Sequence, residues 1–134
     1  MSDRPAPGII PFLTIRDGRA HEALAFYQAA FGAHLAECNV APGTDRVMQA
    51  ALFLNEAVLM LSDEFPEYHG RKEGEPDGTT LHLSVDDADA WAARAVTAGA
   101  EVTMPIANQF WGDRYGQLRD PFGFRWSIGS PIAG

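Results

Sequence analysis

Hydrophobic and polar positions follow the same plan twice along the chain. The first half begins with an extended apolar segment over residues 9–16 and continues into a helical pattern. Apolar residues three and four positions apart form one face of that helix: Ala20, Ala23, Leu24, Tyr27 and Phe31. The second half begins with a strictly alternating segment over residues 79–85, and a second helix follows with Ala88, Trp91, Ala92 and Ala95 on one face. This repetition predicts two related modules.

Turn and cap residues mark where these elements begin and end. Gly32 and Gly99 are placed to end the two helices, and Asp17 and Asp87 stand where N-caps are expected. Three extended stretches follow each helix: 34–41, 47–54 and 57–62 in the first half, and 101–106, 115–119 and 124–128 in the second. Asn55-Glu56 is short enough to join a hairpin, and the sequence of residues 120–123 (Asp-Pro-Phe-Gly) is typical of a type I turn. Each half therefore predicts a βαβββ module.

These boundaries predict one domain over residues 9–134, preceded by a flexible tail over residues 1–8. A chain of 134 residues suits one domain of ordinary size. Module one covers about residues 9–62 and module two about residues 79–129. The segment 63–78 between them carries six acidic residues against two basic ones, and we interpret it as a solvated linker.

Several longer phrases resemble a known family. The segments 108–116 (NQFWGDRYG) and 120–126 (DPFGFRW), with 22–27 (EALAFY) and 58–63 (VLMLSD), resemble the PhnB-like branch of the vicinal oxygen chelate superfamily. That superfamily includes glyoxalase I, bleomycin-resistance proteins and extradiol dioxygenases. The resemblance covers residues 9–128 and implies an α+β fold, in which two tandem βαβββ modules form an eight-stranded open barrel-like cup with helices outside. It also implies a homodimer in which modules from two chains complete each pocket.

Strand alternation predicts which side chains line the cup. The helices are expected to cover the apolar positions, such as Leu13, Leu61 and Trp126, so the other face of each strand is left for a ligand. That pocket-facing set mixes apolar, hydroxyl and cationic side chains, as a ligand site does. It comprises Phe12, Thr14, Arg16, Val58, Met60, Ser62, Thr80, His82, Ser84, Arg125 and Ser127.

The resemblance also predicts where a metal would bind. Metal-dependent members hold a divalent ion with His and Glu side chains from four strands, two in each module. Alignment of the strands places Phe12 (or Pro11), Met60, Thr80 and Ser127 at those positions. None of these side chains replaces an imidazole or a carboxylate as a ligand of zinc, nickel or iron. We therefore expect no metal site and no cofactor.

Two features carry candidate chemistry. His82 is a candidate catalytic acid or base, or a donor to a bound ligand, and the alternative is a hydrogen-bonded pocket histidine without a catalytic role. In the predicted loop 108–116, Trp111 and Tyr115 are candidates to stack on a planar ligand, beside the opposite charges of Asp113 and Arg114. Alternatively, these charges form structural pairs and the aromatic rings pack at a dimer seam.

Composition narrows the choice of partners. The formal net charge of −8 argues against binding to nucleic acid or to an anionic membrane surface. Cys38 is the only cysteine, which excludes an intramolecular disulfide and a thiolate-clustered zinc site. No apolar run is long enough to span a bilayer, and the N-terminus lacks the apolar stretch of a signal peptide. We expect a cytoplasmic homodimer that binds a small molecule.

Three functions remain open from the sequence. The first is a binding protein that sequesters a small oxygenated or aromatic ligand without a metal. The second is a metal-free enzyme, such as a lyase or isomerase, in which His82 acts as acid or base on a small oxygenated substrate. The third is a metal-dependent enzyme of the glyoxalase or dioxygenase type. The candidate ligand-binding residues are Phe12, Thr14, Arg16, Met60, Thr80, Trp111, Asp113, Arg114, Tyr115, Arg125 and Ser127.

Overall fold

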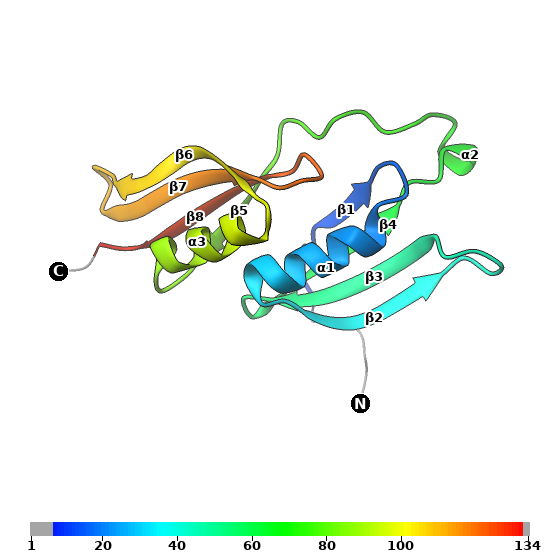
Figure 1. Ribbon diagram of the computed structural model, residues 1–134, viewed down its shortest axis with the longest axis horizontal. Coiled ribbons are helices and arrows are strands. Elements are labelled where there is room, and N and C mark those ends of the chain that lie inside the picture. The colour runs from blue at the N-terminus through cyan, green and yellow to red at the C-terminus, as the bar shows by residue number, and fades with distance from the viewer. Residues whose placement is uncertain (1–6, 133–134) are drawn as a thin grey trace. The chain divides into compact units, whose positions relative to one another are not determined.

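The computed structural model describes residues 7–132, which form two four-stranded sheets and three helices (Figure 1). The chain divides into two compact units. The first contains the residues up to Leu24 together with Ala33–Glu73, and the second contains Ala25–Gly32 and the residues from Gly74 onward. The α+β class and the two βαβββ modules are confirmed. Residues 1–6 of the predicted tail lie outside the described part. No helix within residues 7–132 is both long and apolar enough to cross a bilayer.

The first unit contains the first sheet, in the strand order β1-β4-β3-β2. Its strands are β1 (Phe12–Ile15), β2 (His34–Val40), β3 (Val47–Leu54) and β4 (Ala57–Asp63). The β1 strand runs parallel to β4, and the other neighbours are antiparallel. Asn55 and Glu56 both adopt positive φ angles, 49° and 63°, which a tight two-residue hairpin turn requires. The predicted hairpin between β3 and β4 is therefore confirmed.

Asp63, at the end of β4, ties the start of helix α1 (Ala20–Phe31) to the first sheet. Its carboxylate accepts hydrogen bonds from the backbone N–H of Ala20, at 3.0 Å, and of Val47, at 2.8 Å. The prediction that Asp17 caps this helix is wrong. Asp17 and Gly18 both have positive φ and turn the chain before the helix begins, so the acceptor for Ala20 comes from β4.

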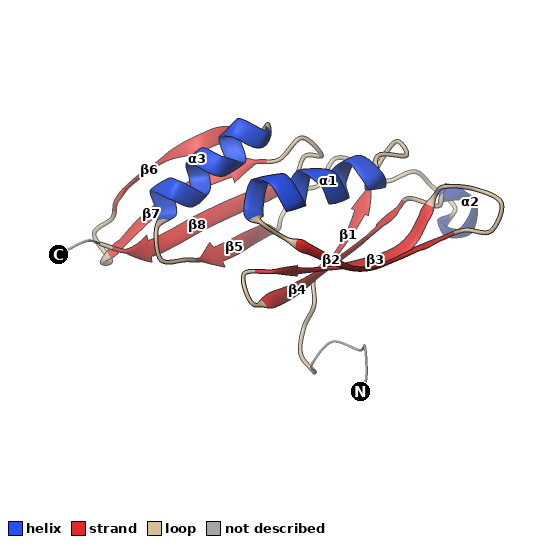
Figure 2. Ribbon diagram, turned by 60° about the horizontal axis from the view of Figure 1, so that its bottom comes forward, coloured by secondary structure: helices blue, strands red, loops and turns tan. Residues whose placement is uncertain are grey.

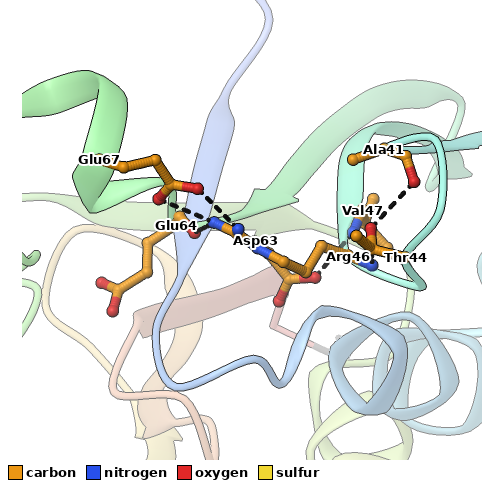
Figure 3. A network of polar contacts seen from close by, with 7 residues as sticks. All are labelled: Ala41, Thr44, Arg46, Val47, Asp63, Glu64 and Glu67. Carbon is orange, nitrogen blue, oxygen red and sulfur yellow. Dashed lines mark hydrogen bonds and ion pairs between the residues drawn. The ribbon is translucent and has the colours of Figure 1, made fainter.

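The predicted linker is more ordered at its start than its acidity suggested. Asp63 and Glu64 are buried, and residues Pro66–His69 form the short helix α2. Arg46 holds this region: its guanidinium donates to both carboxylate oxygens of Glu67 and to the backbone carbonyl of Glu64, as Figure 3 shows. The same guanidinium lies 4.1 Å from the centre of the Phe65 ring. The Arg46 contacts thus order the first part of a segment that we expected to be solvated throughout.

The second unit contains the second sheet, in the matching order β5-β8-β7-β6. Its strands are β5 (Thr80–Ser84), β6 (Glu101–Asn108), β7 (Asp113–Arg119) and β8 (Arg125–Pro131). Helix α3 (Ala88–Ala98) lies across one face of this sheet (Figure 2). The predicted N-cap is confirmed, because the Asp87 carboxylate accepts a hydrogen bond from the Ala90 N–H at 3.1 Å. Gly99 ends the helix, as predicted.

The last two turns of α1 pack with the second unit. Tyr27 and Phe31 are buried there against the ring of Trp126, with centroids 5.6 and 4.8 Å apart. Asp120 begins the predicted turn, in which the Gly123 N–H bonds the Asp120 carbonyl at 3.1 Å. The boundaries predicted from the sequence place all of α1 in the first module. In the structure, the aromatic side chains of its last two turns instead belong to the core of the second unit.

Candidate functional site

The face of the second sheet opposite α3 gathers five of the twelve candidate residues, and we call it the His82 face. Two observations fix its orientation: Leu83 is buried while its neighbour His82 is exposed, and Arg114 reaches α3 while its neighbour Tyr115 points away. Register places three rows of side chains across it. Its members are Thr80, His82, Ser84, Tyr115, Gln117, Arg119, Arg125, Ser127 and Gly129.

His82 is held in place by three neighbours. Its Nδ1 atom lies 2.7 Å from the hydroxyl oxygen of Ser127, its partner in register on β8. Its ring stacks on that of Tyr115, with centroids 6.0 Å apart and planes inclined by 23°. A Cβ atom on Gly129 would stand 3.1 Å from the imidazole Cε1 atom, so the absence of a side chain there leaves room for the ring. His82 therefore has a defined orientation on an open surface.

Aromatic and amide groups extend this cluster. Trp111 packs edge-on against Tyr115 at a centroid distance of 5.6 Å, and Gln117 donates a hydrogen bond to the Tyr115 hydroxyl at 3.0 Å. Trp111 remains 49% exposed, so its ring has free surface for a further contact. The rings of Trp111, Tyr115 and His82 therefore form one contiguous aromatic group, and stacking of a ligand on Trp111 and Tyr115 stays a prediction. The three rings offer a planar ligand a surface on which to stack.

The segment 108–116 is a tight hairpin and not a flexible loop. Backbone hydrogen bonds close a turn over residues 109–112, from the Gln109 N–H to the Asp113 carbonyl at 2.8 Å and from the Gly112 N–H to the Gln109 carbonyl at 3.1 Å. The residues on either side belong to β6 and β7. The predicted loop was too long because Asn108 still belongs to β6 and the residues from Asp113 onward already belong to β7, although most of them are polar.

Arg114 lies on the α3 side of the sheet. It donates to both carboxylate oxygens of Asp89, at 2.5 and 3.1 Å, and to the side-chain carbonyl of Asn108 at 3.0 Å. These hydrogen bonds lower the pKa of Asp89 and raise that of Arg114. Asp113 lies at the far end of β7, paired in register with Pro131. Arg114 thus has a structural partner in α3, 25 positions away, and does not contribute to the His82 face.

Two arginines occupy the row beside His82. Arg119 and Arg125 are partners in register on β7 and β8, and Thr80 pairs with Arg125 from β5. Each guanidinium contacts an acidic side chain from the segment before β5: Arg119 contacts Glu75 at 3.5 Å and Arg125 contacts Asp77 at 3.2 Å. Arg125 was a sequence candidate and Arg119 was not. Register explains the omission, because sequence alone does not say which residue of β7 stands next to Arg125.

The remaining candidates belong to the first sheet. Phe12 pairs with Met60 and Thr14 with Ser62, so the predicted alternation of these strands is confirmed. Phe12 is 49% exposed, and Leu13 and Leu61 are buried on the opposite face. Arg16 follows the last residue of β1. The structure therefore brings Phe12 and Met60 together as neighbours on one sheet face.

The strand register revises one of the positions at which family members hold a metal. In the first sheet, Phe12 pairs with Met60. In the second sheet, the residue paired with Ser127 is His82, whereas Thr80 pairs with Arg125. The residue equivalent to Phe12 is therefore His82 and not Thr80. The hydrogen bonds to the two helices agree with this equivalence. Asp63, three residues after Met60, accepts from the Ala20 N–H, and Ser130, three residues after Ser127, accepts from the Ala88 N–H.

This corrected set still does not fit a divalent metal ion. His82 is its one strong ligand, because a phenyl ring, a thioether and a hydroxyl are poor donors to such ions. Across residues 7–132, no three His, Cys, Asp or Glu side chains gather into a group that could hold a metal. The chemistry available on the His82 face is therefore that of an imidazole, aromatic rings, an amide, hydroxyl groups and two guanidinium groups.

Residues 9–128 match the model of the Glyoxalase/Bleomycin resistance protein/Dioxygenase superfamily. The chain belongs to this superfamily. It is 42% identical over 132 residues to the uncharacterized protein Mb0911c of Mycobacterium bovis, covering 94% of this chain and 84% of that protein.

Solved structures share the fold of this superfamily member. Protein PA1353 of Pseudomonas aeruginosa superposes with a TM-score of 0.75 at 29% identity, covering 94% of this chain and 98% of that one. The PhnB protein of Bacillus cereus superposes with a TM-score of 0.71 at 20% identity, covering 91% and 98% of the two chains. This last likeness is one of fold.

Proposed function

We propose that this superfamily member binds a small aromatic carboxylate on the His82 face without a metal ion. The observation that carries the proposal is the ordered group formed by His82, Tyr115 and Trp111, next to a row containing Arg125. The aromatic rings suit the flat body of a ligand. The guanidinium suits an oxygen-rich head group, which it binds through paired N–H donors.

Charge supports an anionic head in spite of the acidic chain. The net charge of −8 has little effect on a ligand at longer range, because salt screens the interaction between charges that are more than about 10 Å apart. At contact distance the row beside His82 presents two arginines, and these local charges decide which head group is accepted. The proposal therefore concerns a ligand with a carboxylate at one end and an apolar ring at the other.

A binding experiment tests this function. EDTA-treated protein is titrated with 2-naphthoate and with the uncharged 2-naphthamide, followed by tryptophan fluorescence and thermal shift. We expect 2-naphthoate to bind more tightly than the amide, and Tyr115→Leu and His82→Gln to weaken binding at least about tenfold, which corresponds to about 1.4 kcal/mol. The control Thr97→Ala changes an exposed residue of α3 and should bind like wild type. Absence of binding, or full binding by both face variants, would contradict the proposal.

The contact between His82 and Ser127 favours a second candidate function, metal-free proton transfer. The Ser127 hydroxyl can accept from Nδ1 or donate to it, so the contact holds the imidazole in one orientation in either tautomer. An imidazole of fixed orientation on an exposed face is suited to act as acid or base. This function predicts turnover that survives chelation and is lost in His82→Gln while the substrate still binds. Binding without turnover favours the sequestering protein instead.

A further inference from the structure

Arg119 and Arg125 form a pair of like charges on adjacent strands. They are partners in register on β7 and β8 and share the face that carries His82. Like charges directly opposite each other on a sheet destabilise it, unless an anion lies between or beside them. The two positions therefore suit a ligand with two negative charges more than a ligand with one.

The chain supplies two such charges itself. We call residues Gly74–Thr79 the acidic strap; they form neither helix nor strand. From this strap Glu75 contacts Arg119 at 3.5 Å, and Asp77 contacts Arg125 at 3.2 Å. The same Asp77 oxygen accepts a hydrogen bond from the Gly78 N–H at 2.9 Å. The strap thus places two carboxylates, each against one of the two guanidinium groups.

These contacts are weak enough to be exchanged. The Asp77 side chain is 93% exposed and that of Glu75 is 66% exposed, so water screens both ion pairs. Arg125 lies two residues before Ser127 on the same strand, which separates the arginine row from the His82 row by about 7 Å. A ring on the His82 face therefore brings substituents within reach of both arginines.

We infer that Arg119 and Arg125 bind the two carboxylates of a small aromatic dicarboxylate, and that Glu75 and Asp77 compete with this ligand for the same guanidinium groups. The inference rests on the proposed function, because it assumes that the aromatic ring binds on the His82 face. To that function the inference adds two points: the ligand carries two negative charges, and the carboxylates of the acidic strap compete with it. Ligand binding displaces Glu75 and Asp77 of the strap from the two guanidinium groups.

Calorimetric titration with phthalate and benzoate tests the inference. The test variant E75Q/D77N removes both competing charges, and the matched control D45N/D86N removes two charges from exposed positions elsewhere. We expect wild type to bind phthalate more tightly than benzoate. We expect E75Q/D77N to bind phthalate about fivefold more tightly than wild type, as loss of two exposed ion pairs allows, and D45N/D86N to change little. R119Q and R125Q should each abolish the preference for phthalate.

The results separate this inference from the function on which it rests. Equal phthalate affinities in E75Q/D77N and D45N/D86N would overturn the competition. Retention of the phthalate preference in both arginine variants would overturn the dicarboxylate site. In either case, benzoate binding that Tyr115→Leu weakens leaves the proposed function standing. If neither acid binds to wild type or to E75Q/D77N, both proposals fail.

Discussion

The Tyr27 hydroxyl in α1 donates a 2.5 Å hydrogen bond to Oδ2 of Asp120, ninety-three positions later in the chain. The same carboxylate accepts from the indole N–H of Trp126 at 2.9 Å, and from the backbone N–H groups of Phe122 and Phe124 at 2.9 and 3.0 Å. Asp120 is therefore a buried acceptor with four donors. It joins the last turns of α1 to the turn that precedes β8.

Replacement of Tyr27 by Phe removes one of these donors without opening a cavity. A hydrogen bond to a charged group contributes about 1.5–3 kcal/mol, so we expect Tyr27→Phe to lower the free energy of unfolding by roughly that amount. Urea denaturation measures the change. Tyr68→Phe is the matched control, because Tyr68 is 78% exposed, and it should have almost no effect. Equal stabilities of the two variants would contradict the role given to the Tyr27 hydroxyl.

The titration of Asp120 gives a second prediction. Burial raises the pKa of Asp120, although its hydrogen bonds act in the opposite direction, and burial with the nearby Asp120 charge raises the pKa of Tyr27. As pH falls, the folded protein therefore takes up the Asp120 proton before the unfolded chain does. The contribution of this protonation to the free energy of unfolding is complete below the pKa that Asp120 has in the unfolded chain. It is lost as pH rises through the pKa that Asp120 has in the folded protein.

The direction of this pH dependence is measured by comparison with Asp120→Asn, whose side chain cannot titrate. The difference in free energy of unfolding between wild type and Asp120→Asn should grow in favour of wild type as pH falls from neutrality to about 4. Urea denaturation at several pH values measures this difference. A difference that shrinks on acidification would show that hydrogen bonding outweighs burial at this carboxylate.

Gly129 provides a steric test of the His82 arrangement. Its φ angle is not positive, so Ala fits the backbone, but the added methyl group would stand 3.1 Å from the His82 ring. We expect Gly129→Ala to turn the ring away from Ser127, weaken 2-naphthoate binding and cost about 1–3 kcal/mol of stability. Thr97→Ala, at an exposed position of α3, is the control and should bind 2-naphthoate like wild type. An unchanged His82 imidazole NMR signal in Gly129→Ala would contradict the prediction.

Oligomeric state is a separate prediction. Each sheet has two edge strands with one partner within that sheet, and such edges are commonly covered by association with a second copy. The exposed rings of Phe12, Phe53 and Phe110 supply apolar area for such an interface. We expect light scattering to give twice the chain mass of 14.5 kDa at micromolar concentration. A constant mass of one chain over a dilution series would contradict it.

The sequence predicted the features that depend on local pattern. Alternation correctly separated Leu13 and Leu61 from Phe12 and Met60, because successive residues of a strand point to opposite faces. The hairpin at Asn55 and the turn at Asp120 were likewise predicted from short-range turn chemistry. The two βαβββ modules follow from these local signals together with the family resemblance.

The errors at Arg114, at the start of α1 and at His82 concern partners far apart in the chain. Arg114 binds Asp89, and the start of α1 is held by Asp63, which is forty-three positions from Ala20. No local pattern reveals such pairs. The position of His82 opposite Ser127 depends on the offset between β5 and β8, and alternation alone is satisfied equally well by an offset of two residues. Gln117 and Gly129 were missed for the same reason.

Backbone NMR with 2-naphthoate tests the central claim, binding on the His82 face without a metal, most directly. Isotope-labelled protein treated with EDTA, with its metal content verified by elemental analysis, is titrated with the ligand. The account predicts saturable shifts of the backbone signals of His82, Tyr115, Gln117 and Ser127 and of the Trp111 indole N–H, at less than about a tenth of an equivalent of bound metal. Shifts confined to the groove between α3 and β6, around Val96, Val102 and Met104, would contradict it. Binding that requires added Zn²⁺, Ni²⁺ or Mn²⁺ would contradict it equally.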